Sequence, residues 1–178
     1  LQTQGFTVTL LPPSAAGLIT PQQLADALQP DTCLVSIMFA NNEIGTVQPI
    51  AELGALCREH GALFHTDAVQ AAGHLAIDVQ TTNIDLLSLS GHKFHGPKGV
   101  GAAYIRGDDY GLPPMSAFMH GGEQEHGLRA GTLAVHNIVG FGKAAELAIA
   151  NEQRQIACIQ KLEKKDKKII ASNEHLEL

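Results

Sequence analysis

Short apolar runs alternate with amphipathic segments over most of the chain. Five runs have lengths typical of β-strands: residues 6–11, 33–39, 62–64, 86–89 and 100–105. Residues 21–29 and 50–60 instead place apolar side chains at helical spacing, and a proline stands at or just before the start of each. This alternation predicts an α/β fold, a mostly parallel sheet with helices on both faces. The run at 33–39 is nearly unbroken, so we expect that strand to be buried on both faces.

The sequence after residue 105 is less regular. A helical pattern runs from residue 134 to about residue 159, and the lysine-rich stretch at 161–168 is either its solvated continuation or a linker. The chain therefore divides into a sheet-bearing part, residues 1–133, and a helical part, residues 134–178. Between the last predicted strand and the helix we expect a loop, a short strand and a glycine-rich irregular segment: residues 106–114, 115–119 and 121–132.

Polar side chains follow three of the predicted strands, where each strand ends. Asn42 follows the second apolar run, Asp67 the third, and the turn from Ser90 to Lys93 the fourth. The carboxyl ends of parallel strands meet at one edge of a sheet, which is where open α/β sheets bind ligands. A partly desolvated lysine there can lose its proton and attack a carbonyl carbon.

Each of these residues also has an ordinary structural interpretation. Asp67 is suited to capping a helix or closing a turn, and equally to pairing with a protonated ring nitrogen. Asn42 is typical of a turn, and Lys93 of a solvated loop. Only the combination of an amine, an acid, an amide and the hydroxyl and imidazole of Ser90 and His92 indicates a site for a phosphorylated pyridine aldehyde, pyridoxal phosphate.

Composition and charge argue against several classes of partner and site. The net charge of −6 over 178 residues, without a basic face outside the C-terminal part, argues against nucleic acid. No apolar run reaches about 18 residues, so we expect no membrane span. Three cysteines, an odd number, favour a reducing compartment such as the cytoplasm. We expect no metal site, because no cysteine pair or carboxylate pattern accompanies the four histidines that are candidate ligands: His92, His95, His120 and His126.

Four motifs carry a resemblance to a known family. They are Asn-Asn-Glu-Ile-Gly at 41–45, His-Thr-Asp-Ala-Val-Gln at 65–70, Ser-Gly-His-Lys at 90–93 with Gly-Pro-Lys-Gly at 96–99, and Leu-Arg-Ala-Gly-Thr at 128–132. In order and spacing they resemble cysteine desulfurases of the NifS and IscS type, in the class V branch of the fold-type I pyridoxal-phosphate enzymes. The resemblance implies that residues 1–133 are the central part of a cofactor-binding large domain. Residues 134–178 would then lead toward a small C-terminal domain that is mostly absent.

The resemblance also implies a role for each matching residue. Lys93 would bond to the cofactor aldehyde and act as the catalytic base. Asp67 would pair with the pyridine nitrogen, and Thr132 would reach the cofactor phosphate of the neighbouring subunit in a homodimer. Asn42 and Gln70 would contact the 3-oxygen of the ring. Ser90 and His92 would contact the phosphate.

The implied reaction converts L-cysteine to L-alanine and passes sulfur to an enzyme cysteine as a persulfide, from which a sulfur-acceptor protein takes it. The family's ring-stacking histidine, phosphate-loop threonine, nucleophilic cysteine and substrate-binding arginine have no match here, so we expect this chain alone to be nearly inactive. Cys33, Cys57 and Cys158 fall on predicted strands or helices, which favours buried structural roles. Glu123 and His126 also depart from the family's glycine-loop pattern. Alternatives are a selenocysteine lyase, another class V aminotransferase, or a catalytically silent domain that keeps only the fold.

Overall fold

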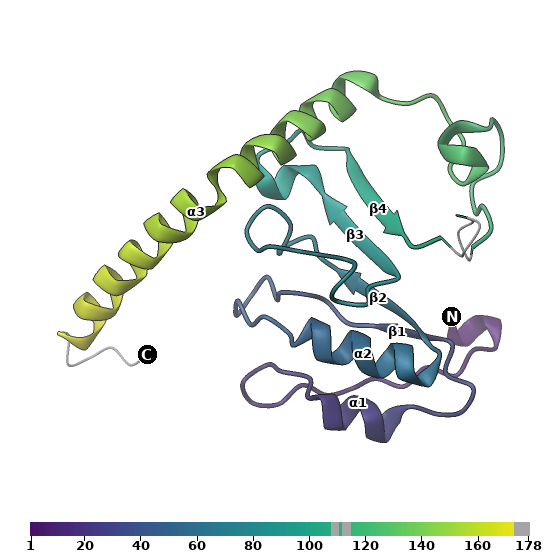
Figure 1. The fold of residues 1–178 in the computed structure, drawn as a ribbon, viewed down its shortest axis with the longest axis horizontal. Coiled ribbons are helices and arrows are strands. Elements are labelled where there is room, and N and C mark those ends of the chain that lie inside the picture. Colours follow the sequence, from purple (N-terminus) through teal and green to yellow (C-terminus); the bar gives the residue numbers. More distant parts are fainter. Residues whose placement is uncertain (108–110, 112–114, 173–178) are drawn as a thin grey trace.

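The computed structural model describes residues 1–107, 111 and 115–172. Within these residues lies a four-stranded sheet in the order β1-β2-β3-β4 (Figure 1). Strands β1 (Leu34–Ser36), β2 (Leu63–Asp67) and β3 (Leu86–Ser90) are parallel, whereas β4 (Gly101–Ile105) is antiparallel to β3. The prediction of a mostly parallel sheet is confirmed, and the tight turn after Lys93 explains why the last strand runs backwards.

Two helices form where the sequence predicts them: α1 (Pro21–Ala27) precedes β1, and α2 (Ile50–His60) connects β1 to β2. Helix α1 begins at Thr20, whose hydroxyl accepts a hydrogen bond from the backbone N–H of Gln23 while the Gln23 side chain accepts one from the N–H of Thr20. Helix α2 ends at Gly61, which has a φ of 86°. Glycine readily adopts this left-handed conformation, which commonly ends a helix.

The main core lies between α2 and one face of the sheet. Phe64 and Thr66 of β2 point to this face, and both are fully buried. Gly54 lets α2 approach closely, because a Cβ at this position would lie 2.2 Å from the Thr82 carbonyl oxygen. The core also contains Val35 and Leu87 from the flanking strands and, from α2, Leu53 and Cys57.

Two strands predicted in the first part of the chain differ from the structure. Residues 6–11 form no strand, and Phe6 and Leu10 are 54% and 85% exposed, because no described strand lies beside them to pair with. The strand predicted at 33–39 is shorter and is not buried on both faces, since Leu34 is 44% exposed. Its path continues beside β2, where the N–H groups of Ile37 and Phe39 donate to the carbonyls of His65 and Asp67.

The described part of the segment after residue 114 also differs from prediction. No strand forms over 115–119, where Met119 makes only an isolated bridge with Arg129. Residues 108–110 and 112–114 of the predicted loop lie outside the described residues. Two short 3-10 helices occur elsewhere, η1 (Gln2–Gln4) at the start and η3 (Gln124–Gly127) in the glycine-rich segment.

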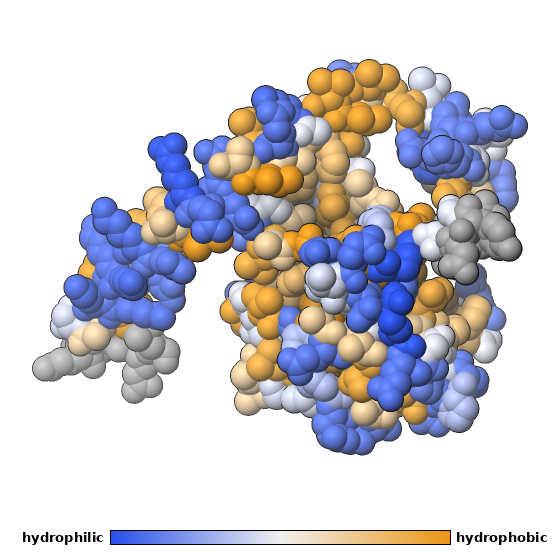
Figure 2. Space-filling view, viewed as in Figure 1, coloured by the Kyte–Doolittle hydropathy of each residue, from blue (hydrophilic) through white to orange (hydrophobic). Residues whose placement is uncertain are grey.

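Helix α3 (Val135–Ala171) continues well beyond residue 159. The lysine-rich stretch is therefore a continuation of the helix, where Lys167 pairs with Glu163 one turn earlier at 2.6 Å. Figure 2 shows this distal part projecting from the body with a largely hydrophilic surface. Among the described helices, none combines the length and apolar character needed to cross a membrane.

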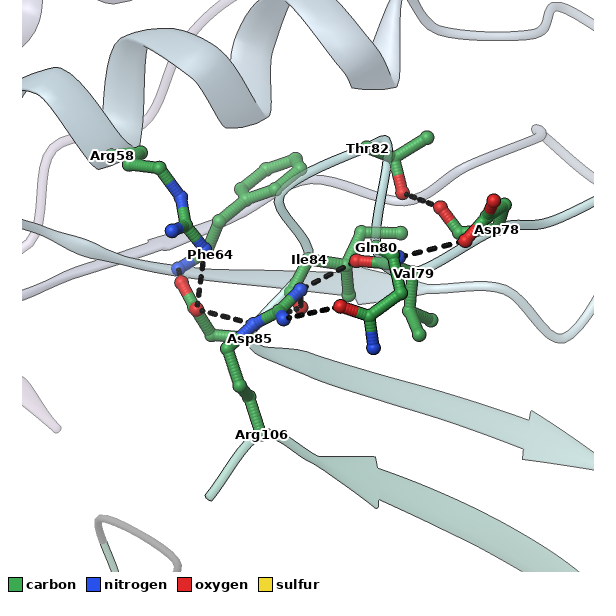
Figure 3. Close-up of polar contacts among 9 residues, drawn as sticks. All are labelled: Arg58, Phe64, Asp78, Val79, Gln80, Thr82, Ile84, Asp85 and Arg106. Atoms are coloured by element: carbon green, nitrogen blue, oxygen red, sulfur yellow. Dashed lines mark hydrogen bonds and ion pairs between the residues drawn. The ribbon is translucent and has the colours of Figure 1, made fainter. Parts of the chain in front are cut away.

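An ion pair fixes the end of the sheet opposite the strand carboxyl ends (Figure 3). Asp85, just before β3, accepts a hydrogen bond from the backbone N–H of Phe64 at 2.9 Å and pairs with Arg106 Nε at 3.3 Å. Arg106, just after β4, also donates to the carbonyl oxygens of Val79 and Ile84. These contacts join β2, β3 and β4 to the connecting segment at residues 79–84.

The buried hydroxyl of Thr66 has no hydrogen-bond partner among the described residues. Thr66→Val keeps the shape of the side chain and removes this unpaired group, so we expect it to raise the free energy of unfolding by about 1 kcal/mol. Denaturant unfolding measures the change. Thr82→Val is the matched control: its hydroxyl donates to the Asp78 carbonyl at 2.7 Å, so its replacement should lower stability. A loss of stability in Thr66→Val would contradict the expectation.

Candidate functional site

The strand carboxyl ends bring most of the predicted site residues to one edge of the sheet. Asp67, the last residue of β2, lies in register with Ser88 of β3, and Ser90 is two residues further along β3. Residues two apart in a strand share a face, so Asp67, Ser88 and Ser90 project from the same side. That side is opposite the one covered by α2.

The loop that carries Asn42 lies beside Asp67. Phe39 donates its N–H to the Asp67 carbonyl at 2.8 Å, and the loop closes through a bridge between Ala40 and Val47. The Asn41 side chain holds this loop by accepting from the N–H groups of residues 43 and 44. Asn42 is therefore exposed at the edge of the sheet, where its amide donates to Glu43 Oε1 at 3.0 Å.

Asp67 closes a turn and still has a carboxylate oxygen to offer. Its Oδ1 accepts from the N–H of Val69 at 2.9 Å, whereas no hydrogen bond to Oδ2 is found in the described chain. Ala68 donates to the Ser88 carbonyl at 2.9 Å, which keeps the turn attached to β3. Gln70 lies half-buried on the same turn. The structural and chemical interpretations of Asp67 are thus compatible.

Lys93 lies in a short, tightly held turn after β3. The 3-10 helix η2 (Gly91–Phe94) carries it, and the side chain is half-buried. The hydroxyl of Ser90 and Nδ1 of His92 are 2.8 Å apart at the start of η2. The imidazole of His74 lies with Nε2 3.1 Å from the Lys93 carbonyl oxygen. Backbone and side-chain contacts thus fix Lys93 near the ends of β2 and β3.

Helix α3 supports the Lys93 turn from the other side. Phe94 is buried against Ala144 and Ala148, and its ring meets that of Phe141 edge to face at 5.4 Å. Gly91 permits this approach, since a Cβ there would lie 2.7 Å from a Phe141 ring carbon. The first half of α3 therefore packs directly on the turn that presents the lysine.

Thr132 is not brought to this edge. It is exposed in the segment that leads into α3. Figure 1 shows the neighbouring η3 standing apart from the carboxyl ends of β2 and β3. Within η3, Glu125 and His126 both have positive φ angles, 51° and 56°, which non-glycine residues rarely adopt.

Two of the three cysteines are placed differently from expectation. Cys57 is buried as predicted, and burial and the nearby charge of Asp85 raise the pKa of its thiol to about 11, so it stays protonated at neutral pH. Cys33 and Cys158 are exposed, so the expectation that they are buried is wrong. Cys33 precedes β1, at the opposite end of the strand from the edge described above, and Cys158 lies in the projecting half of α3.

Sequence reasoning gave no role to His65, His74 or Phe141. His65 lies on the same sheet face as Asp67. The sequence could have predicted this, because residues two apart in a strand share a face. Its partners, Ser36 and Ser88, come from the two flanking strands, so only the strand register identifies them. The contacts of His74 and Phe141 with the Lys93 turn depend on tertiary packing and have no local signal.

Comparisons with known proteins place this arrangement in a family. The model of the family described as aminotransferase class-V matches residues 1–178. The chain belongs to this family. It is 54% identical over 162 residues to "Cysteine desulfurase IscS" of Methanosarcina thermophila, an alignment covering 91% of this chain and 39% of that relative. The chain thus spans about two fifths of the length of the curated relatives that it matches.

Solved structures share the fold. DndA from Streptomyces lividans matches with a TM-score of 0.90 and 39% identity, covering 97% of this chain and 49% of that one. The structure titled "SspA in complex with cysteine" matches with a TM-score of 0.78 and 51% identity, over 82% of this chain and 41% of that one. The predicted resemblance to cysteine desulfurases and the fold class are therefore confirmed.

Proposed function

We propose that this chain provides the lysine-bearing, cofactor-binding edge of a pyridoxal-phosphate-dependent cysteine desulfurase. The observation that carries the proposal is the placement of the Asp67 carboxylate and the Lys93 turn at the adjoining carboxyl ends of β2 and β3. Relatives named cysteine desulfurase support L-cysteine as substrate, as does the neighbour solved with cysteine.

The chemistry of the donor set fits the cofactor. Asp67 would hold a protonated ring nitrogen with the oxygen that its turn leaves available. Ser90 and His92, already joined at 2.8 Å, would hold the phosphate. Asn42 and Gln70 would lie near the ring 3-oxygen, and Lys93 would be the residue that bonds covalently to the ligand.

When bound, pyridoxal phosphate supplies an electron-poor ring that stabilises negative charge at the substrate Cα. Once the substrate amine has displaced Lys93 from the cofactor carbon, the free Lys93 Nζ would accept the proton from the substrate Cα and pass it on. Asp67 would keep the ring nitrogen protonated meanwhile. Because Cys57 is buried and protonated, and Cys33 and Cys158 lie away from the edge, the cysteine that accepts sulfur would come from outside these residues.

Several partners follow from the same proposal. Thr132, exposed and apart from Lys93, would contact the cofactor phosphate of a second subunit in a homodimer. A sulfur-acceptor protein would remove the persulfide sulfur. Three free cysteines support a reducing compartment such as the cytoplasm. The 178-residue chain alone would release little or no alanine from cysteine.

Adding pyridoxal phosphate to the chain tests the cofactor assignment. We expect the visible absorbance that the aldehyde acquires on condensing with a lysine, and its absence would favour a domain that keeps only the fold. Alanine release by the complete protein, measured with cysteine and with selenocysteine as substrates, tests the reaction. Turnover of selenocysteine alone would assign a selenocysteine lyase instead, and transamination of either substrate without sulfur or selenium release would assign an aminotransferase.

A further inference from the structure

A histidine lies on the open face of the sheet just before Asp67. His65 is two residues from Asp67 in β2, so the two side chains project from the same face. Its Nδ1 lies 2.8 Å from the Ser36 hydroxyl of β1, and its Nε2 lies 3.4 Å from the Ser88 hydroxyl of β3. The imidazole thus bridges the neighbouring strands on both sides of the one that ends in Asp67.

The two serines hold the ring without adding charge. A hydroxyl can donate or accept, so Ser36 and Ser88 satisfy both ring nitrogens of a neutral imidazole in either tautomer. Burial lowers the pKa of His65, and the charge of Asp67 opposes this by raising it. The effect of burial is the larger of the two, so the pKa of His65 lies below its usual value and the ring is mainly neutral at pH 7.

A neutral ring at this position matters for what Asp67 can bind. An imidazolium beside the carboxylate would compete with any cationic ligand for the same charge. A neutral imidazole leaves the Asp67 carboxylate available for a cationic ligand. Its contacts with Ser36 and Ser88 still connect β2 to β1 and β3.

We propose that His65 is a positioning residue: bridged by Ser36 and Ser88, it fixes the end of β2 and reserves the Asp67 carboxylate for a protonated pyridine nitrogen. The identity of that ligand rests on the proposed function. The coupling between His65 and Asp67 does not, and it can be measured without any ligand.

The first test follows the imidazole NMR signals of the full 178-residue chain against pH. The His65 signal is identified by its loss in His65→Gln. We expect Asp67→Asn to lower the His65 pKa further, because the carboxylate that favours the charged ring is gone. Asp78→Asn, at a carboxylate that caps a remote turn, is the matched control and should leave it unchanged. An unchanged His65 pKa in Asp67→Asn, with the chain still folded by circular dichroism, overturns the proposal.

The second test adds pyridoxal phosphate and compares two replacements of His65. His65→Lys places a fixed cation near Asp67 and should weaken binding about tenfold. His65→Gln is neutral, and its amide can still bond to the two serine hydroxyls, so it should lose clearly less. Equal losses in the two variants would mean that His65 serves the fold alone, and would refute the proposal. If the unchanged chain binds no pyridoxal phosphate, the proposed function fails, while the NMR result still decides whether His65 and Asp67 are coupled.

Discussion

Replacing Lys93 with alanine is expected to abolish the visible absorbance that pyridoxal phosphate acquires on the chain, and to lower alanine formation by the complete protein by at least about 10³-fold. Lys93 is half-buried and lies in a turn that Phe94, Gly91 and the His74 contact hold in place. No other described lysine occupies the end of β3. Spectrophotometric titration with pyridoxal phosphate, followed by a cysteine-dependent alanine assay, measures both effects.

Lys98 provides the matched control for this prediction. It lies five residues further on, is exposed, and contributes its backbone carbonyl to a contact with Asn137 at 3.5 Å. Lys98→Ala should therefore leave the absorbance and the rate nearly unchanged. Lys93→Arg keeps the positive charge but lacks a nucleophilic amine, so it should behave like Lys93→Ala. Equal absorbance in Lys93→Ala and in the unchanged chain would place the reactive amine elsewhere.

Elements with local signals were predictable from the sequence. Thr20 and Gln23 form a reciprocal cap at the start of α1, and Gly61 closes α2, because both signals act within a few residues. The parallel order of β1, β2 and β3 followed from the alternation of strands and helices. For the same reason the edge carrying Asp67 and Lys93 was predictable, since residues after parallel strands meet at one edge.

The features that sequence reasoning missed depend on distant neighbours. The run at 6–11 has the alternation of a strand, yet a strand also requires a partner, and Leu10 remains 85% exposed. An unbroken apolar run does not reveal whether both faces of a strand are covered by other elements. In β1 one face is not covered, since Leu34 is exposed. The sequence alone does not decide whether the lysine-rich end of α3 is helical, because pairing such as that of Lys167 with Glu163 is weak.

The candidate site shows the same division. Motif order and strand ends indicated Asp67, Ser90 and Lys93. The tertiary contacts that support Asp67 and the Lys93 turn come instead from Phe39, which follows β1, from His74 and from α3. The bridge from Ser36 through His65 to Ser88 requires the register of three strands. Local chemistry in the sequence thus locates the reactive groups, and tertiary packing decides their environment.

Replacing Asp85 with alanine should cause the largest loss of stability from a polar residue in the described chain. The substitution removes the acceptor for the N–H of Phe64, whose side chain is fully buried, and the partner of Arg106 Nε. Removing one member of a buried pair costs about 3–5 kcal/mol. The Asp85 and Arg106 side chains are 15% and 23% exposed, so the pair is only partly buried. In the variant, Arg106 still donates hydrogen bonds to the carbonyl oxygens of Val79 and Ile84. We therefore expect the free energy of unfolding to fall by about 2–3 kcal/mol.

Two further variants in the same cluster should cost less stability than Asp85→Ala. Asp85→Asn keeps an acceptor for Phe64 but loses the charge, so its cost should be about half. Arg58→Ala removes a partner that is 54% exposed and 4.0 Å from Asp85, so its cost should be below about 0.5 kcal/mol. Guanidinium unfolding of the three variants measures the series. Equal costs for Asp85→Ala and Arg58→Ala would show that the Asp85 carboxylate does not join β2 to β3 and β4. Because this network lies at the sheet end away from Lys93, the expected losses are in folding stability, with pyridoxal phosphate binding by the folded fraction unchanged.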